Sequence, residues 1–229
     1  MMKDIGKRIE FHTHSLFSDG MLLPAEIIHM AKLKDFAAIA ITDHVDPSNL
    51  KTVLNSLNEF VKECQGRFEV PFIPGVELSY VEPARILHYA EQAKKLGAKV
   101  VIVHGETPAE DVPKGTNKAG LAGKGVVDIL AHPGFITEEE VGMAKDNGIY
   151  LELTSKKGHS LTNGHVAKLA QKVGAKMLVA SDMHAPEDLI DQATAFKVAK
   201  ASGLSEAEAL KVVRDNPKEL YLRITSTKI

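Results

Sequence analysis

The chain has 229 residues, of which 44% are hydrophobic, and its formal net charge is −2 at pH 7. This length suits one α/β barrel-sized domain over residues 1–229, and the near-neutral charge gives no overall positive field for tight, non-specific binding of nucleic acid. Cys64 is the only cysteine, so we expect no internal disulfide. The first residues lack the apolar core of a signal peptide, and no apolar run reaches the roughly 18 residues of a membrane span. We therefore expect a cytoplasmic domain without a membrane segment.

Short apolar runs alternate with helical patterns along the chain. The runs are 9–12, 36–42, 70–78, 99–103, 126–131, 149–153 and 177–180. The helical patterns are 24–34, 48–64, 83–96, 138–147, 162–173 and 186–202, followed by a helix that begins at Ser205. Continuous apolar runs predict parallel strands covered on both faces. We predict a distorted (β/α)7 TIM-like barrel on which helices of 185–229 pack, with an open doubly wound sheet as the alternative.

The glycine-rich segment 115–125 lies between the fourth and fifth runs. It lacks the spacing of a nucleotide-triphosphate loop, which ends in a lysine followed by Ser or Thr. We expect a flexible loop near the functional face, where it could act as a lid.

Side chains of the types that bind metals fall at or just beyond the ends of the apolar runs. They are His12, His14, Asp19, His44, Glu77, His104, His132, Asp182 and His184. The carboxyl ends of parallel strands meet at one face of a barrel, so these side chains should lie close together. Neutral imidazole and carboxylate oxygens are common ligands of zinc, manganese and iron. The sequence therefore predicts a metal site.

The same residues resemble the polymerase and histidinol phosphatase (PHP) superfamily of metal-dependent phosphoesterases. The resemblance rests on motifs in family order between residues 9 and 184. They are Phe11-His12-Thr13-His14-Ser15, Ser18-Asp19-Gly20, Thr42-Asp43-His44, Pro74-Gly75-Val76-Glu77, His104, Ala131-His132-Pro133 and Ser181-Asp182-Met183-His184. The resemblance implies a distorted seven-stranded β/α barrel that binds two to three divalent metal ions.

The resemblance also implies how the ligands divide between the metals. The first metal would take His12, His14, Glu77 and Asp182, the second Glu77, His104 and His132, and the third Asp19, His44 and His184. A carboxylate shared by two cations holds them on the order of 3.5 to 4 Å apart. The cations would lower the pKa of a water molecule, and the resulting hydroxide would attack phosphorus while the cations neutralise the phosphate oxygens.

Five further side chains are candidates for roles beside the metals. We expect Asp43 to orient an imidazole N–H. Lys156 and Lys157, after the sixth run, could bind phosphate oxygens, as could Arg85, although a solvated charged loop would explain the lysines equally well. His159 could bind substrate or protonate the leaving group as a general acid.

Three functions are compatible with this pattern. The favoured one is hydrolysis of a small phosphomonoester resembling histidinol phosphate. The second is a phosphodiesterase or exonuclease acting on nucleotides or short oligonucleotides. The third is a non-catalytic RNA-binding protein, because residues 161–184 are similar to part of the archaeal and eukaryotic ribonuclease P barrel subunit; that subunit lacks the intact His-x-His metal set that this chain keeps. The sequence does not indicate an oligomeric state.

Overall fold

A parallel sheet forms the centre of the computed structural model, which describes residues 4–64 and 66–226. The strands are β1 (Ile9–Glu10), β2 (Ala38–Ile41), β3 (His44–Val45), β4 (Phe72–Leu78), β5 (Val100–His104), β6 (Ile129–Ala131), β7 (Tyr150–Thr154) and β8 (Met177–Ala180). They follow the order β1-β2-β4-β5-β6-β7-β8, and β3 also pairs with β4. Because β2 and β3 are successive segments beside the same strand, the sheet has seven positions, as the seven apolar runs predict. The ends of the predicted domain, residues 1–3 and 227–229, lie outside the described residues.

The two edges of the sheet meet just beyond β1 and β8. Thr13 forms a parallel bridge with Met183. The backbone N–H of His14 donates to the carbonyl of Met183 (2.8 Å), and the N–H of Met183 donates to the carbonyl of His12 (3.3 Å). These bonds close the carboxyl end of the sheet into a barrel, so the prediction of a TIM-like barrel is confirmed and the open sheet is wrong.

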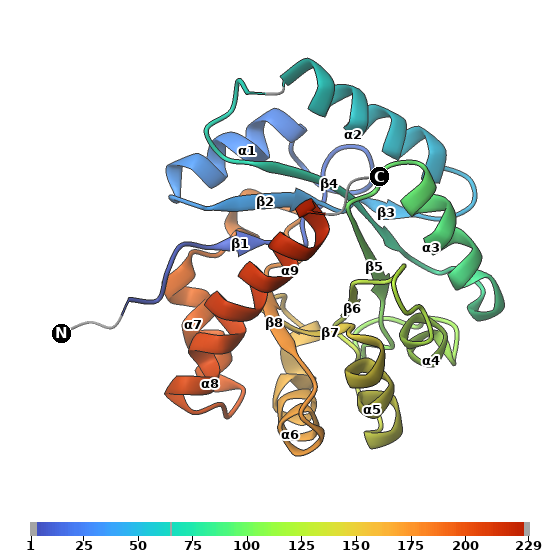
Figure 1. The fold of residues 1–229 in the computed structure, drawn as a ribbon, viewed down its shortest axis with the longest axis vertical. Helices are drawn as coiled ribbons and strands as arrows, with labels where there is room; N and C mark the ends of the chain where they lie inside the picture. Colours follow the sequence, from blue (N-terminus) through green and yellow to red (C-terminus); the bar gives the residue numbers. More distant parts are fainter. Residues whose placement is uncertain (1–3, 65, 227–229) are drawn as a thin grey trace.

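Helices surround this barrel (Figure 1). The α-helices are α1 (Pro24–Leu33), α2 (Leu50–Cys64), α3 (Ile86–Lys95), α4 (Thr116–Leu121), α5 (Glu138–Asn147), α6 (Asn163–Val173), α7 (Gln192–Ala201), α8 (Glu206–Leu210) and α9 (Asn216–Ser226). Three 3-10 turns, η1 (Pro83–Arg85), η2 (His159–Thr162) and η3 (Pro186–Asp188), precede α3, α6 and α7, and a π-helical turn, η4 (Lys211–Asp215), joins α8 to α9.

The strands bury apolar side chains on both faces. Ile39 and Ile41 of β2 pack toward the surrounding helices, whereas Ala38 and Ala40 belong to a second cluster inside the barrel. That inner cluster also contains Leu220 and Ile224 of α9, which lies beside β1 and β8 (Figure 1). Because α9 packs against the amino end of the barrel, the polar residues gather at the carboxyl end.

The segment 115–125 is not the flexible loop expected from its glycines. Residues 116–121 form α4, which packs on β5 and β6. The Glu106 carboxylate accepts from the N–H groups of Gly115 and Asn117 at the start of this helix. A methyl group at Gly120 would lie 3.0 Å from Val103 Cγ1, so this glycine permits close packing rather than mobility.

A buried ion pair ties β1 to β8. Arg8 Nη2 lies 2.5 Å from Glu10 Oε2, both side chains are almost fully buried, and Arg8 also donates to the carbonyl of Val179. The Glu10 carboxylate accepts from the Ser181 hydroxyl (2.8 Å) and from the backbone N–H of His12 (3.1 Å). The pair therefore anchors both chain segments that carry the first and last sequence motifs.

Replacing Arg8 by Met should lower the free energy of unfolding by about 3 to 5 kcal/mol, because it leaves the Glu10 charge buried without its partner. Urea unfolding followed by circular dichroism measures this change. The matched control is Lys7→Met, which removes the exposed Lys7–Asp35 pair and should cost under about 1 kcal/mol. Equal effects of the two substitutions would show that the buried pair is not a major support of the barrel.

Candidate metal centre

The nine predicted metal ligands all lie at the carboxyl end of the barrel. His12 and His14 follow β1, and Asp19 lies on the loop after them. His44 begins β3, Glu77 lies in β4 and His104 ends β5. His132 follows β6, and Asp182 and His184 follow β8. The barrel thus brings together side chains that are up to 172 positions apart in the sequence.

The first group of donors is fully buried and tightly packed. His12 Nε2 lies 3.1 Å from Glu77 Oε2, and His14 Nε2 lies 3.2 Å from Asp182 Oδ1. The crossed distances, His14 to Glu77 and His12 to Asp182, are 3.5 and 3.6 Å. His12, His14 and Glu77 can place one donor atom each within 4.8 Å of the others, as three ligands of one cation would, and Asp182 lies beside both imidazoles.

A second group shares the Glu77 carboxylate. Glu77 Oε1 lies 3.7 Å from His132 Nε2, whereas Oε2 faces His12 and His14. The His104 and His132 rings meet edge to face with their centres 4.5 Å apart, and Glu77, His104 and His132 can place one donor atom each within 4.8 Å of the others. Because its two oxygens face different imidazoles, Glu77 is placed to bridge two cations.

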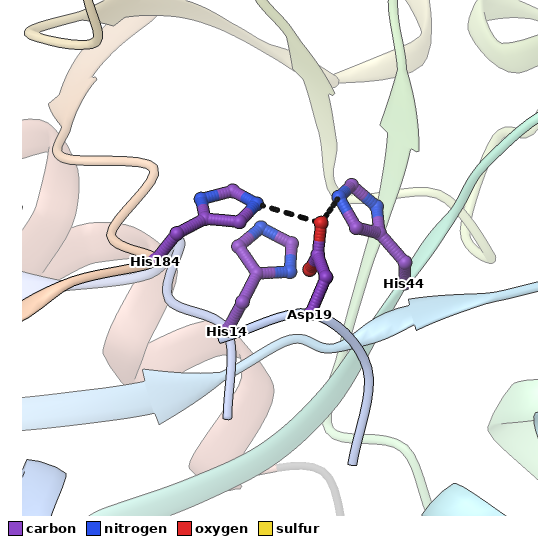
Figure 2. Close-up of side chains that lie close together, drawn as sticks. All are labelled: His14, Asp19, His44 and His184. Atoms are coloured by element: carbon purple, nitrogen blue, oxygen red, sulfur yellow. Dashed lines mark ion pairs between the residues drawn. The ribbon is translucent and has the colours of Figure 1, made fainter. Parts of the chain in front are cut away.

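The third group is more exposed. Asp19 Oδ2 lies 3.4 Å from His184 Nε2 and 3.8 Å from His44 Nε2 (Figure 2). The His14 ring lies between the other two imidazoles, with its centre 4.2 Å from each of theirs. Asp19 comes from the loop after β1 and its side chain is 57% exposed, so this group opens toward solvent.

Three imidazoles of the centre, those of His12, His104 and His184, have an acceptor at Nδ1, so that Nε2 points inward. The Nδ1 partners are Glu152 for His12 (2.7 Å), the Gly105 carbonyl for His104 (3.1 Å) and the Asp182 carbonyl for His184 (3.0 Å). His44 differs, because its Nδ1 lies 2.6 Å from Ser79 Oγ and also 2.9 Å from Glu77 Oε2. A carbonyl or carboxylate can only accept, so in His12 and His104 Nδ1 carries a proton and Nε2 is the nitrogen that faces the centre. Metal-binding histidines are typically held in this way.

Several buried polar atoms of the centre have no hydrogen-bond partner among the described residues. They are His12 Nε2, both ring nitrogens of His14, both oxygens of Glu77, His132 Nδ1 and Asp182 Oδ1. A buried polar group without a partner costs about 1 to 3 kcal/mol. A cluster of such groups is therefore unusual unless a ligand satisfies them. A mixed set of imidazole and carboxylate donors fits divalent cations such as zinc, manganese or iron.

The electrostatics of the centre keep Glu77 charged and His14 neutral, whereas the neighbouring carboxylates raise the pKa of His12 and His44. Burial raises the pKa of the Glu77 carboxyl, but the charges of His12 and His44 outweigh burial and hold that pKa well below its usual value. Burial is the largest reason that the pKa of His14 falls to about 3, which leaves this imidazole neutral. A charged carboxylate and a neutral imidazole are the forms that bind metals.

Two of the ligand positions have a strained backbone. His132 has φ 25° and Asp182 has φ 50°, in the left-handed region that residues other than glycine seldom adopt. His132 directly follows β6, and Asp182 is the second residue after β8. Strain of this kind concentrates at functional sites, where the surrounding structure holds the residue in place.

Glu152 is a residue of the centre that the sequence pattern did not single out. It lies in β7, is fully buried and accepts from His12 Nδ1. Burial raises the pKa of this carboxyl. Its one sequence signal is a charged residue in the middle of an otherwise apolar strand, Tyr150–Thr154.

The role expected for Asp43 is wrong. Its carboxylate accepts from the N–H (2.7 Å) and hydroxyl (2.8 Å) of Ser15 and from the hydroxyl of Ser18 (2.8 Å). Asp43 therefore shapes the loop between β1 and α1 that carries Asp19, and Glu152 is the carboxylate that orients an imidazole.

The three basic candidates differ in position. A cavity of about 660 Å³ opens beside the third group, and Lys156, His159 and Tyr80 are among its lining residues. Lys156 Nζ lies 2.9 Å from Asp188 Oδ2 and 3.1 Å from His184 Nδ1. Lys157 and Arg85 are exposed and do not line this cavity, and the Arg85 guanidinium lies over the Tyr89 ring. Neither residue is placed to bind a substrate there.

Comparison with known proteins agrees with the architecture and the motifs. The PHP domain model matches residues 10–119. An uncharacterized protein of Methanocaldococcus jannaschii is 45% identical over 218 residues, which is 95% of this chain and 100% of the relative. A probable phosphatase of Thermoanaerobacter sp. is 28% identical over 240 residues and covers 96% of each chain.

A solved structure with a similar fold is a chain of archaeal ribonuclease P with mature tRNA. It has a TM-score of 0.69 at 16% identity and covers 96% of this chain and 90% of that chain. At this identity the likeness concerns the fold alone. In the described part of the chain, every helix is too short or too polar to cross a membrane.

Replacing Glu152 by Ala should weaken binding of the first metal by roughly 10- to 100-fold, because His12 loses the carboxylate that fixes its ring. Calorimetric titration of stripped protein with Mn²⁺ measures the change. Glu139→Ala is the control, since Glu139 is exposed and pairs with the exposed Lys118. Unchanged affinity in the Glu152 variant would contradict the orienting role.

Proposed function

The chain belongs to the PHP domain family, and from this membership and its donor set we propose that it is a metal-dependent phosphoesterase that hydrolyses a small phosphomonoester. The observation that carries the proposal is the Glu77 carboxylate, whose two oxygens face separate sets of imidazoles. The probable phosphatases among the relatives support the same reaction class. A cytoplasmic location is still a prediction.

Divalent cations held by these residues would neutralise charge on the phosphate oxygens and lower the pKa of a water molecule. The protein supplies the placement. Glu77 would hold one cation on each of its oxygens, Glu152 fixes the His12 ring, and the Arg8–Glu10 pair holds the segments that lead to His12 and Asp182. Phosphoryl transfer depends mainly on such positioning and on charge neutralisation.

The cavity favours a small substrate. Its volume of about 660 Å³ is in the range of small-molecule sites, and Asp182, His104 and His184 of the metal centre lie in its wall. Lys156 adds a cation beside the third group, where it can bind a phosphate oxygen. The polar and apolar lining suits an ester with a polar leaving group, as in histidinol phosphate.

The direct test is phosphate release from a panel of sugar, amino-alcohol and nucleotide monoesters, with histidinol phosphate among them. Stripped protein resupplied with single divalent metals should release phosphate from at least one of them. His132→Ala should remove this activity and leave the circular dichroism spectrum largely unchanged. No release from any monoester by metal-loaded protein, with cleavage of end-labelled oligonucleotides instead, would replace the proposal with a phosphodiesterase.

Lys156→Met should raise KM for the phosphate ester by about tenfold or more, because a charge-assisted hydrogen bond contributes roughly 1.5 to 3 kcal/mol. Lys157→Met is the matched control, because Lys157 is exposed and lies outside the cavity lining. Steady-state kinetics on the preferred substrate measures both variants. Equal KM values for the two variants would rule out a substrate contact by Lys156.

A further inference from the structure

We propose that His159 and Glu110 are additional ligands of the second metal, beside Glu77, His104 and His132. The inference rests on the proposed metal-dependent function and extends the set of nine ligands to the loops after β5 and β7. Two independent observations carry it: the orientation of the His159 ring and the distances between Glu110 and two imidazoles.

The His159 ring is held in the same way as those of His12 and His104, with a hydrogen-bond partner at Nδ1 and Nε2 facing the centre. It is 6% exposed, its ring stacks on His132 with the centres 4.3 Å apart, and Nδ1 lies 2.7 Å from Thr107 Oγ1. Thr107 Oγ1 also accepts from the N–H of Ala109, which is consistent with Nδ1 donating and Nε2 keeping its lone pair. His132, His159 and Asp182 can place donor atoms within 4.8 Å of one another.

Glu110 lies between two inward-facing nitrogens. Its Oε2 is 3.2 Å from His104 Nε2, and its Oε1 is 3.3 Å from His159 Nε2. The distances match those in the first group, 3.1 Å for His12 with Glu77 and 3.2 Å for His14 with Asp182. In both places a carboxylate oxygen and an imidazole Nε2 are as close as neighbouring ligands of one cation.

The loops that carry these two residues hold each other in place. Ala109 Cβ lies 3.2 Å from the position that a side-chain carbon would take at Gly158, and Thr107 contacts His159. The Tyr80 hydroxyl donates to Glu110 Oε2 (3.2 Å) from the end of β4. Glu110 itself is 39% exposed and lines the cavity, so it joins the second group of donors to the space that a substrate would occupy.

The geometry is less suited to a general acid at His159. Its Nε2 faces Glu110 Oε1 and, at 3.9 Å, Asp182 Oδ2. A general acid needs its N–H directed at the leaving oxygen. Nε2 instead points at the carboxylates that a cation would share with it.

The test is a Co²⁺ titration of stripped full-length protein, followed by visible absorption and by metal analysis after dialysis. The variants are Glu110→Gln and His159→Asn; the Asn amide can keep a contact with Thr107 but has no atom at the Nε2 position. The controls are Asp111→Asn, an exposed carboxylate on the same loop, and His88→Asn, an exposed histidine. In each test variant we expect one equivalent of Co²⁺ to bind at least about tenfold more weakly and the Co²⁺ absorption spectrum to change. In the controls we expect neither the affinity nor the spectrum to change.

Unchanged affinity and spectrum in both test variants would overturn the ligand assignment. A slower reaction of His159→Asn with unchanged metal binding would also overturn it and would assign His159 to substrate binding or proton transfer instead. These results are distinct from failure of the proposed function, in which wild-type protein would bind metal and release no phosphate from any monoester.

Discussion

The closure of the barrel between β1 and β8 is the constraint on which the rest of the structure depends. The Thr13–Met183 bridge places His12 and His14, from the first sequence motif, beside Asp182 and His184, from the last. Below the bridge, the Arg8–Glu10 pair and the Ser181 hydroxyl bind the same two segments together. Without this closure the first group of donors would be divided between two separate sheet edges.

The metal centre brings free-energy costs that the fold must balance. Unpartnered donors, buried carboxylates and the left-handed backbone of His132 and Asp182 are each unfavourable in the protein alone. The interior compensates with apolar packing on both faces of the strands and with α9 against the amino end of the barrel. A bound cation would add to stability, because the unfolded chain has no preformed site.

The sequence predicts the barrel and the location of its polar end well, because continuous apolar runs and the donors that follow them are local signals. It does not predict Glu152 or Glu110. Glu152 is a single charge inside an apolar strand, and Glu110 lies on an irregular loop, so their partners appear only in three dimensions. The same limit explains two wrong expectations. The glycines of 115–125 indicate a loop where the structure has α4, and the position of Asp43 beside His44 indicates an imidazole partner where the structure has serines.

The most direct test of a metal centre is a crystal structure of the protein loaded with Mn²⁺, with diffraction recorded above and below the manganese absorption edge. We expect an anomalous peak among His12, His14, Glu77 and Asp182 and a second on the other side of the Glu77 carboxylate, toward His104 and His132. Loaded protein that gave no peak at either position, or peaks only at surface carboxylates, would show that these residues do not form a metal centre.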